Sequence, residues 1–197
     1  MRIFIFTIVS ILAVSTSVAQ SKGKTIYVGD IISDTTTFGR DRDLPSILKS
    51  KNEIELRFIK FPSFDYTSYT VMTFDKEWKA KHYYYNPGKD SLLSKNIIGK
   101  MDVDSVFSQL VSNNIFSLPD QNSLRTVKYT YDPETGTLAG TGMSVNDGTC
   151  YCIEFKVGDL YRRYMYCNPE DYKDFYTHVH ELREFSNIVK IMEDFIK

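Results

Sequence analysis

Three cysteines have the strongest potential for covalent chemistry, and their spacing favours a disulfide over catalysis. Cys150 and Cys152 lie two positions apart, so on a strand their Cα atoms are about 7 Å apart, too far for an easy bond. If Gly158 and Asp159 form a two-residue turn, Cys150 faces Cys167, and we predict a bond between them. The alternative is that all three thiols are reduced and partly buried. Cys152 has no neighbouring base that would make it a nucleophile.

The histidines are the next candidates, because two of them are closely spaced. On a strand, His178 and His180 would share one side and could chelate a metal. On a helix, residues two apart point about 200° away from each other and cannot share an ion. The surrounding pattern is helical, so we predict two surface histidines and no metal site. His82 is isolated in the sequence.

No motif for catalysis or cofactor binding is complete in this sequence. The glycines at 136, 140 and 142 suggest a phosphate-binding loop, but the lysine and hydroxyl residue of a P-loop are missing. A nucleophile elbow, a zinc-protease motif and a Cys-x-x-Cys pair are also absent. We therefore expect no cofactor and favour a protein that is not an enzyme. The alternative is a hydrolase-type site assembled from distant residues such as Asp41, Asp43, His82 or His178.

Aromatic residues are abundant, with 14 Tyr and 13 Phe but a single Trp. Such rings can stack on a sugar or a peptide, and an exposed patch of them would mark a binding surface. The candidate ligand-binding residues are Trp78, Tyr83, Tyr85 and Tyr161. The alternative is that these rings pack in the core, because about half of the residues in an alternating strand must face inward.

Alternating and helical patterns place these residues on an antiparallel sheet covered by helices. Ile54, Leu56 and Phe58 alternate with charged residues, which predicts a half-buried strand. Further strands are predicted at 66–74 and 78–85, and a hairpin at 149–157 and 160–167.

Amphipathic helices are predicted at about 102–113 and about 170–196, the second with a break near His178. The fold class is therefore α+β, with an antiparallel sheet of about five to seven strands. Residues 132–148 are expected to form a long flexible loop or a loosely held hairpin.

The first residues predict export. A positive start, an apolar run of about twelve residues and a small-residue Ser17-Val18-Ala19 site are typical of a cleaved signal peptide over 1–19. A spanning helix would need roughly twenty apolar residues, so no membrane span is expected after cleavage. Residues 20–197 would then form a single α+β domain with a mobile N-terminal start, in the periplasm or secreted.

The charge balance restricts the partners. The chain has 24 Lys+Arg against 25 Asp+Glu and no basic stripe, so we expect no nucleic-acid partner. The function predicted from these features is a non-enzymatic binding or interaction module at the cell envelope, with a protein or glycan ligand. The alternatives are the hydrolase-type enzyme and a secreted inhibitor that presents the loop 132–148 to its target.

Overall fold

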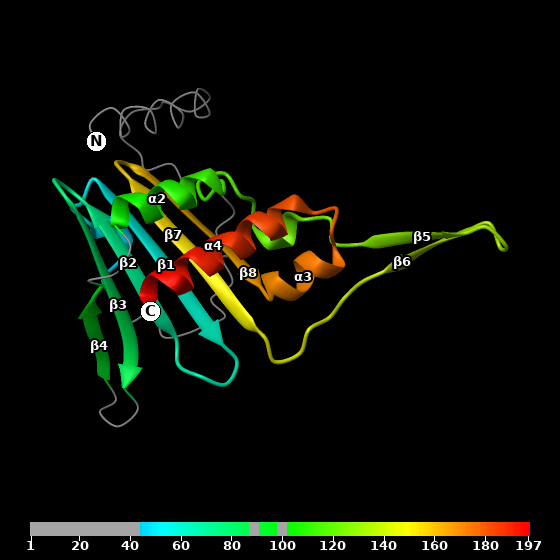
Figure 1. Ribbon diagram of the computed structural model, residues 1–197, viewed down its shortest axis with the longest axis horizontal. Helices are drawn as coiled ribbons and strands as arrows, with labels where there is room; N and C mark the ends of the chain where they lie inside the picture. The colour runs from blue at the N-terminus through cyan, green and yellow to red at the C-terminus, as the bar shows by residue number, and fades with distance from the viewer. Residues whose placement is uncertain (1–43, 87–90, 98–101) are drawn as a thin grey trace.

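A six-stranded antiparallel sheet forms the centre of the computed structural model, which describes residues 44–86, 91–97 and 102–197 (Figure 1). The strand order is β4-β3-β2-β1-β7-β8. The strands are β1 (Ile54–Pro62), β2 (Ser68–Phe74), β3 (Trp78–Asn86), β4 (Ser91–Asn96), β7 (Thr149–Val157) and β8 (Leu160–Cys167). With the helices described below, this sheet confirms the predicted α+β fold class.

Two consecutive units build the sheet and meet at its centre. Strands β1 to β4 form a meander, and β7 and β8 form a hairpin. They are joined by antiparallel pairing of β1 with β7, in which Ile54 lies opposite Val157 and Pro62 lies opposite Thr149. Strand β1 is therefore flanked on both sides.

The β7–β8 hairpin has the register predicted from its turn. Gly158 adopts a positive φ of 57°, which glycine tolerates without strain, and Val157 faces Leu160. The same register places Glu154 opposite Arg163 and Cys150 opposite Cys167.

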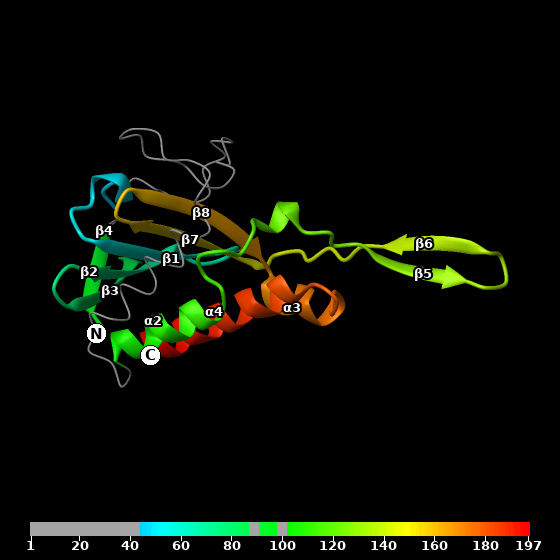
Figure 2. The ribbon, with the colours of Figure 1, turned by 90° about the horizontal axis from the view of Figure 1, so that it is seen from above.

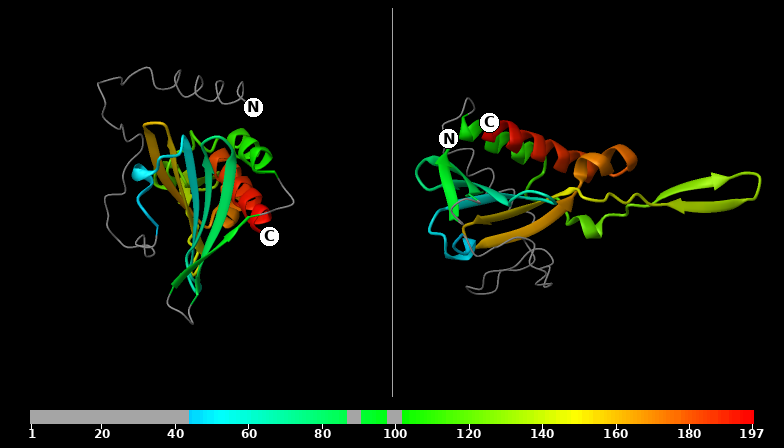
Figure 3. Two further views of the ribbon diagram at one scale, coloured as in Figure 1. Left: turned by 90° about the vertical axis from the view of Figure 1, so that its left-hand side faces the viewer. Right: turned by 90° about the horizontal axis from the view of Figure 1, so that it is seen from below.

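Helices cover one face of the sheet, as Figures 2 and 3 show. They are α2 (Val103–Ser112), α3 (Pro169–Phe175) and α4 (His180–Ile196). The predicted C-terminal helix is interrupted between Phe175 and His180, as its pattern near His178 indicated. The buried face of α4 contains Leu182, Phe185, Ile188, Val189, Met192 and Phe195. None of the helices in the described ranges is both long and apolar enough to cross a membrane.

The opposite face of the sheet, which we call the second face, carries no α-helix within the described residues. A short 3-10 helix, η1 (Ile47–Lys49), lies on this side. Residues 44–52, which include η1, lie over this face, where η1 contacts β7, and are called the strap below. Ile47 anchors the strap, because its side chain is buried.

A separate hairpin projects from one end of the molecule (Figures 1 and 2). It consists of β5 (Lys128–Asp132) and β6 (Thr137–Thr141), which form a two-stranded sheet of their own. The sequence predicts a loop or a loosely held hairpin over residues 132–148, and β6 is the regular strand within that segment. The connection between the strands is closed by Gly136, whose N–H donates to the carbonyl of Asp132.

Candidate functional site: a lysine-rich pocket on the second face

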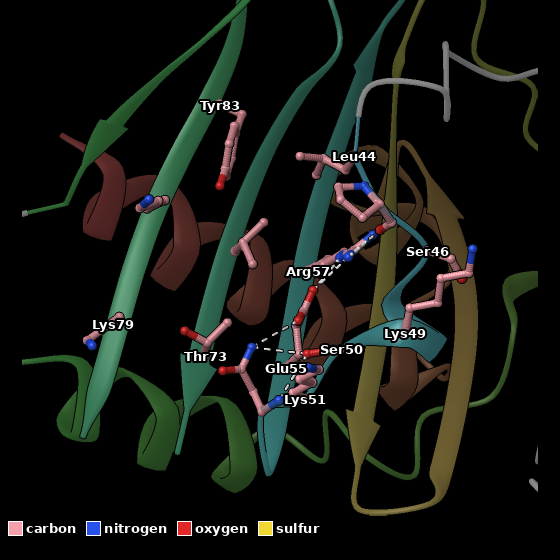
Figure 4. Close-up of a pocket in the computed structure, with 14 residues that line it drawn as sticks. Leu44, Ser46, Lys49, Ser50, Lys51, Glu55, Arg57, Thr73, Lys79 and Tyr83 are labelled. Carbon is pink, nitrogen blue, oxygen red and sulfur yellow. Dashed lines mark hydrogen bonds and ion pairs between the residues drawn. The ribbon is translucent and has the colours of Figure 1, made fainter. Parts of the chain in front are cut away.

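A pocket of about 410 Å³ lies on the second face, between the strap and strands β1, β2 and β3 (Figure 4). The strap contributes Leu44, Pro45, Ser46, Lys49, Ser50, Lys51 and Asn52, and the strands contribute Glu55, Arg57, Val71, Thr73, Lys79, Lys81 and Tyr83. Figure 4 shows the helices behind the sheet, so the pocket and the helical layer lie on opposite sides of it. Because the three strands are neighbours in the sheet, their alternate residues converge on one surface.

Two residues at the floor of the pocket, Glu55 and Arg57, belong to a buried ion-pair network that continues outside the pocket to Glu154. The Arg57 Nε donates to Glu55 Oε1 at 2.8 Å, and its Nη1 lies 3.8 Å from Glu154 Oε2. The exposed fractions of Glu55, Arg57 and Glu154 are 6%, 8% and 8%. Each charge is therefore paired where water cannot reach it freely, as a buried charge requires.

The network extends along the sheet to strand β8. Glu154 also accepts a hydrogen bond from the Tyr161 hydroxyl at 3.1 Å and lies 3.6 Å from Arg163 Nη1. Burial, with the nearby charge of Glu154, raises the pKa of Tyr161 well above its usual range. Tyr161 is thus a neutral hydrogen-bond donor to a carboxylate.

The same network holds the strap against the sheet. Arg57 Nη2 donates to the carbonyl of Pro45 at 2.7 Å, and Lys156 Nζ donates to the carbonyl of Ser50 at 3.1 Å. Asn52 Nδ2 lies 3.0 Å from Ser50 Oγ and 3.3 Å from Glu55 Oε2. These bonds fix one wall of the pocket before any ligand arrives, which reduces the ordering cost of binding.

The rim of the pocket is positively charged. Lys49, Lys51, Lys79 and Lys81 line it, whereas Glu55 is the one carboxylate among the described lining residues and is paired with Arg57. Lys79 makes an exposed ion pair with Glu77 at 3.2 Å. The other three lysines form no ion pair with another described residue. An anion that enters the pocket would therefore meet several cations that are not fully neutralised.

The predicted aromatic residues divide between the two faces of the sheet. Tyr83 lines the pocket, and Tyr85, two positions further along β3, lies on the same face with its ring centroid 4.6 Å from that of Tyr66. Tyr161 lies on the second face as well, beside Glu154. Trp78 points to the helical side.

Trp78 is partly buried and packs against the core on that side. Its ring centroid lies 5.2 Å from that of Phe74 and 4.5 Å from that of Phe107 on helix α2. Trp78 therefore lies on the other side of the sheet from the pocket that Tyr83 lines, and its role in ligand binding stays a prediction. The reason is strand alternation, since Trp78 lies opposite Phe74, whose side chain also faces the helices.

The candidate hydrolase residues do not converge in the described part of the structure. His82 lies on β3 within 3.0 Å of Thr70 Oγ1, and burial, together with Lys95, lowers its pKa. His178 lies in the connection between α3 and α4, and Figure 1 shows this connection well away from strand β3, which carries His82. Asp41 and Asp43 lie outside the described residues. No cluster of three metal-binding side chains exists within the described ranges.

Sequence reasoning missed the pocket, because its residues come from separate segments. The alternation along β1 predicts that Glu55 and Arg57 lie on the charged face of a half-buried strand, whereas the structure buries both. The sequence contains one signal for this network. Glu55 and Arg57 are opposite charges two positions apart on β1, and Glu154 faces Arg163 in the predicted hairpin, so the two units carry complementary charges. The lysines of the strap and of β3 carried no comparable signal.

The cysteines are joined as the hairpin register suggested. A disulfide connects Cys150 and Cys167 at the end of the β7–β8 pair, and Cys152 is a buried thiol outside this bond. The disulfide therefore links the two strands on the second face.

Peptide mapping of the purified protein without reductant should find Cys150 and Cys167 in one linked fragment. A Cys150→Ser, Cys167→Ser double variant should lose about 3 kcal/mol of unfolding free energy, because the bond closes a short loop of the unfolded chain. If both thiols were alkylated without prior reduction, the predicted bond would be wrong.

Comparisons of this chain with protein-family models, with curated proteins and with solved structures found no match. The pocket and its charges are therefore the basis for the functional proposal.

Proposed function

We propose that this protein is an exported, non-enzymatic binding module that holds an acidic glycan of the cell envelope in the lysine-rich pocket. The observation that carries the proposal is the set of four lysines around a floor whose own charges are already paired. A carboxylate or sulfate on a sugar ring would find its counter-charge at this rim. The floor would contribute a fixed shape and little net charge.

Tyr83 supports a sugar as the ligand. Its ring lines the same pocket as the lysines, and an aromatic face beside a polar rim is suited to the apolar face of a sugar ring. The volume of about 410 Å³ falls within the range of small-ligand pockets, which extends from about 300 to 1,000 Å³. One or two sugar units would fill it.

The same geometry gives little support to a hydrolase at this site. Hydrolysis of a glycosidic bond normally uses a pair of Asp or Glu side chains, one as an acid and the other as a base or nucleophile. Among the described lining residues Glu55 is the only carboxylate and no histidine is present, and Glu55 is held by Arg57 and Asn52. The pocket is therefore better suited to binding than to bond cleavage.

Calorimetry with matched oligosaccharides tests the proposal. The purified protein should bind a uronic-acid oligosaccharide and should bind the neutral sugar of the same length much more weakly. The affinity should fall as salt is added, because exposed charges are screened over about 8 Å at physiological ionic strength.

Reversal of one rim charge in Lys81→Glu should weaken binding about tenfold, or about 1.4 kcal/mol.

The matched control is Lys190→Glu, which reverses an exposed charge on α4, on the helical side of the sheet. This variant should bind as the parent protein does. Equal affinity for the neutral and acidic sugars, or equal effects of the two charge reversals, would contradict the proposal. Binding of acidic peptides but not of acidic sugars would show that the anion site is real and that the ligand is not a glycan.

A further inference from the structure

The projecting β5–β6 hairpin has an apolar face that nothing in the described structure covers. Tyr129, Tyr131 and Leu138 are 64%, 62% and 63% exposed. They share one face, because Tyr131 lies opposite Leu138 and Tyr129 lies two positions before Tyr131. Gly140 lies opposite Tyr129, and a Cβ at this position would come within 3.4 Å of the tyrosine ring.

The other face of the hairpin is polar and has a charge at each end of β5. Lys128 lies at the base, where its ammonium is 5.5 Å from the ring centroid of Phe175, and it stays exposed. Asp132 lies at the tip, where it accepts hydrogen bonds from the Glu134 N–H at 2.9 Å and the Thr135 hydroxyl at 2.7 Å. These bonds lower the pKa of Asp132, so this carboxylate is ionised at neutral pH.

A two-stranded hairpin of this length is at best marginally stable in water, and three or more strands are normally needed. The sheet of β5 and β6 has no third strand within the described residues, so β5 has an outer edge with no neighbouring strand there. Such an edge is a template for pairing with another chain.

We propose that a second copy of this chain occupies the β5 edge, with the two β5 strands antiparallel about a two-fold axis at Thr130. The two hairpins then form one four-stranded sheet in the order β6-β5-β5-β6. The contact is isologous, since the same residues take part on both sides, and it closes as a dimer.

The sequence of β5 is complementary to itself in this register. Lys128 of each copy lies opposite Asp132 of the other, which creates two opposite-charge pairs on the polar face. On the apolar face, Tyr129 of each copy lies opposite Tyr131 of the other, so that the exposed rings cover one another.

The β6 edge offers no such match. The equivalent pairing about Ala139 would place Thr137 opposite Thr141 and Leu138 opposite Gly140, without any charge pair. Charge complementarity therefore selects β5. The direction of the hairpin also suits this arrangement, because it points away from the six-stranded sheet and leaves the two bodies at opposite ends of the joint sheet (Figures 1 and 2).

Sedimentation velocity of the purified protein over a wide concentration range tests the proposal. The parent protein should shift from monomer to dimer as its concentration rises. Thr130→Lys places two like charges directly opposite each other at the axis, so it should raise the dimer dissociation constant roughly fivefold or more. Ala139→Lys is the matched control, because Ala139 lies opposite Thr130 on the same polar face but on β6. It should leave the dissociation constant nearly unchanged.

A pair of cysteine variants gives a second, geometric measurement. Thr130→Cys should form a disulfide-linked dimer under a thiol oxidant, because the two cysteines face each other at the axis. Ala139→Cys should form much less. A parent protein that stays monomeric at all concentrations would overturn the proposal, as would equal effects at positions 130 and 139. Preferential cross-linking at 139 would show that the copies pair through β6 instead.

Discussion

Replacing Phe185 with alanine should lower the free energy of unfolding by about 3–5 kcal/mol. The ring is fully buried and lies almost parallel to that of Tyr166, with the two centroids 4.1 Å apart. The ring also packs edge-on against that of Tyr164, with the two ring centroids 6.0 Å apart. Truncation would leave a cavity between helix α4 and strand β8, and these rigid elements cannot collapse to fill it. Urea unfolding followed by circular dichroism measures the loss.

Phe64→Ala is the matched control, because the Phe64 side chain is 84% exposed. The same truncation at this position should change the free energy of unfolding by no more than about 0.5 kcal/mol. A loss below about 1 kcal/mol for Phe185→Ala would mean that this face of α4 does not pack on the sheet.

Replacing Arg57 with methionine should cost about 3–5 kcal/mol as well, for an electrostatic reason. Methionine keeps much of the buried volume but removes the charge that Glu55 and Glu154 share. Two carboxylates would then lie in the sheet with too few partners, and the strap would lose its bond to the carbonyl of Pro45. Urea unfolding at neutral pH measures this loss too.

Two further variants distinguish a buried network from a surface one. Lys79→Met breaks the exposed pair with Glu77 and should cost at most about 1 kcal/mol. A Glu55→Gln, Arg57→Met double variant should lose less unfolding free energy than the two single variants lose in total. The reason is that most of the loss in each single variant comes from the buried charge that is left without its partner. Additive losses would refute the coupling between these side chains.

Local patterns were sufficient to predict most of the elements. The alternation of Ile54, Leu56 and Phe58 predicts β1, since only one side of a strand can face the helices at a time. The turn at Gly158 defines the register of β7 and β8, because a two-residue loop allows few alternatives. The predicted helices correspond to α2 and to α3 with α4, including the interruption near His178.

Long-range pairing and the pocket could not be predicted in this way. The charges on β1 are complementary to those of the β7–β8 hairpin, but they do not define β7 as its neighbour, because strand order depends on packing of the whole chain. The pocket brings Lys49 of the strap together with Lys81 of β3 across the strands between them, and neither lysine is unusual in its local sequence. Charged residues on a strand are normally solvated, so the burial of Arg57 becomes evident only with Glu154 in place.

The central position of β1 has a consequence for how the chain acquires its structure. Its partner β7 follows about a hundred residues later, so synthesis must pass residue 157 before the middle of the sheet can close. Pairings this distant in sequence are slow to form. Until then the meander presents the long, unpaired edge of β1, which favours aggregation. Truncation anywhere before β7 would make that exposure permanent, so fragments of this protein should be recovered as aggregates.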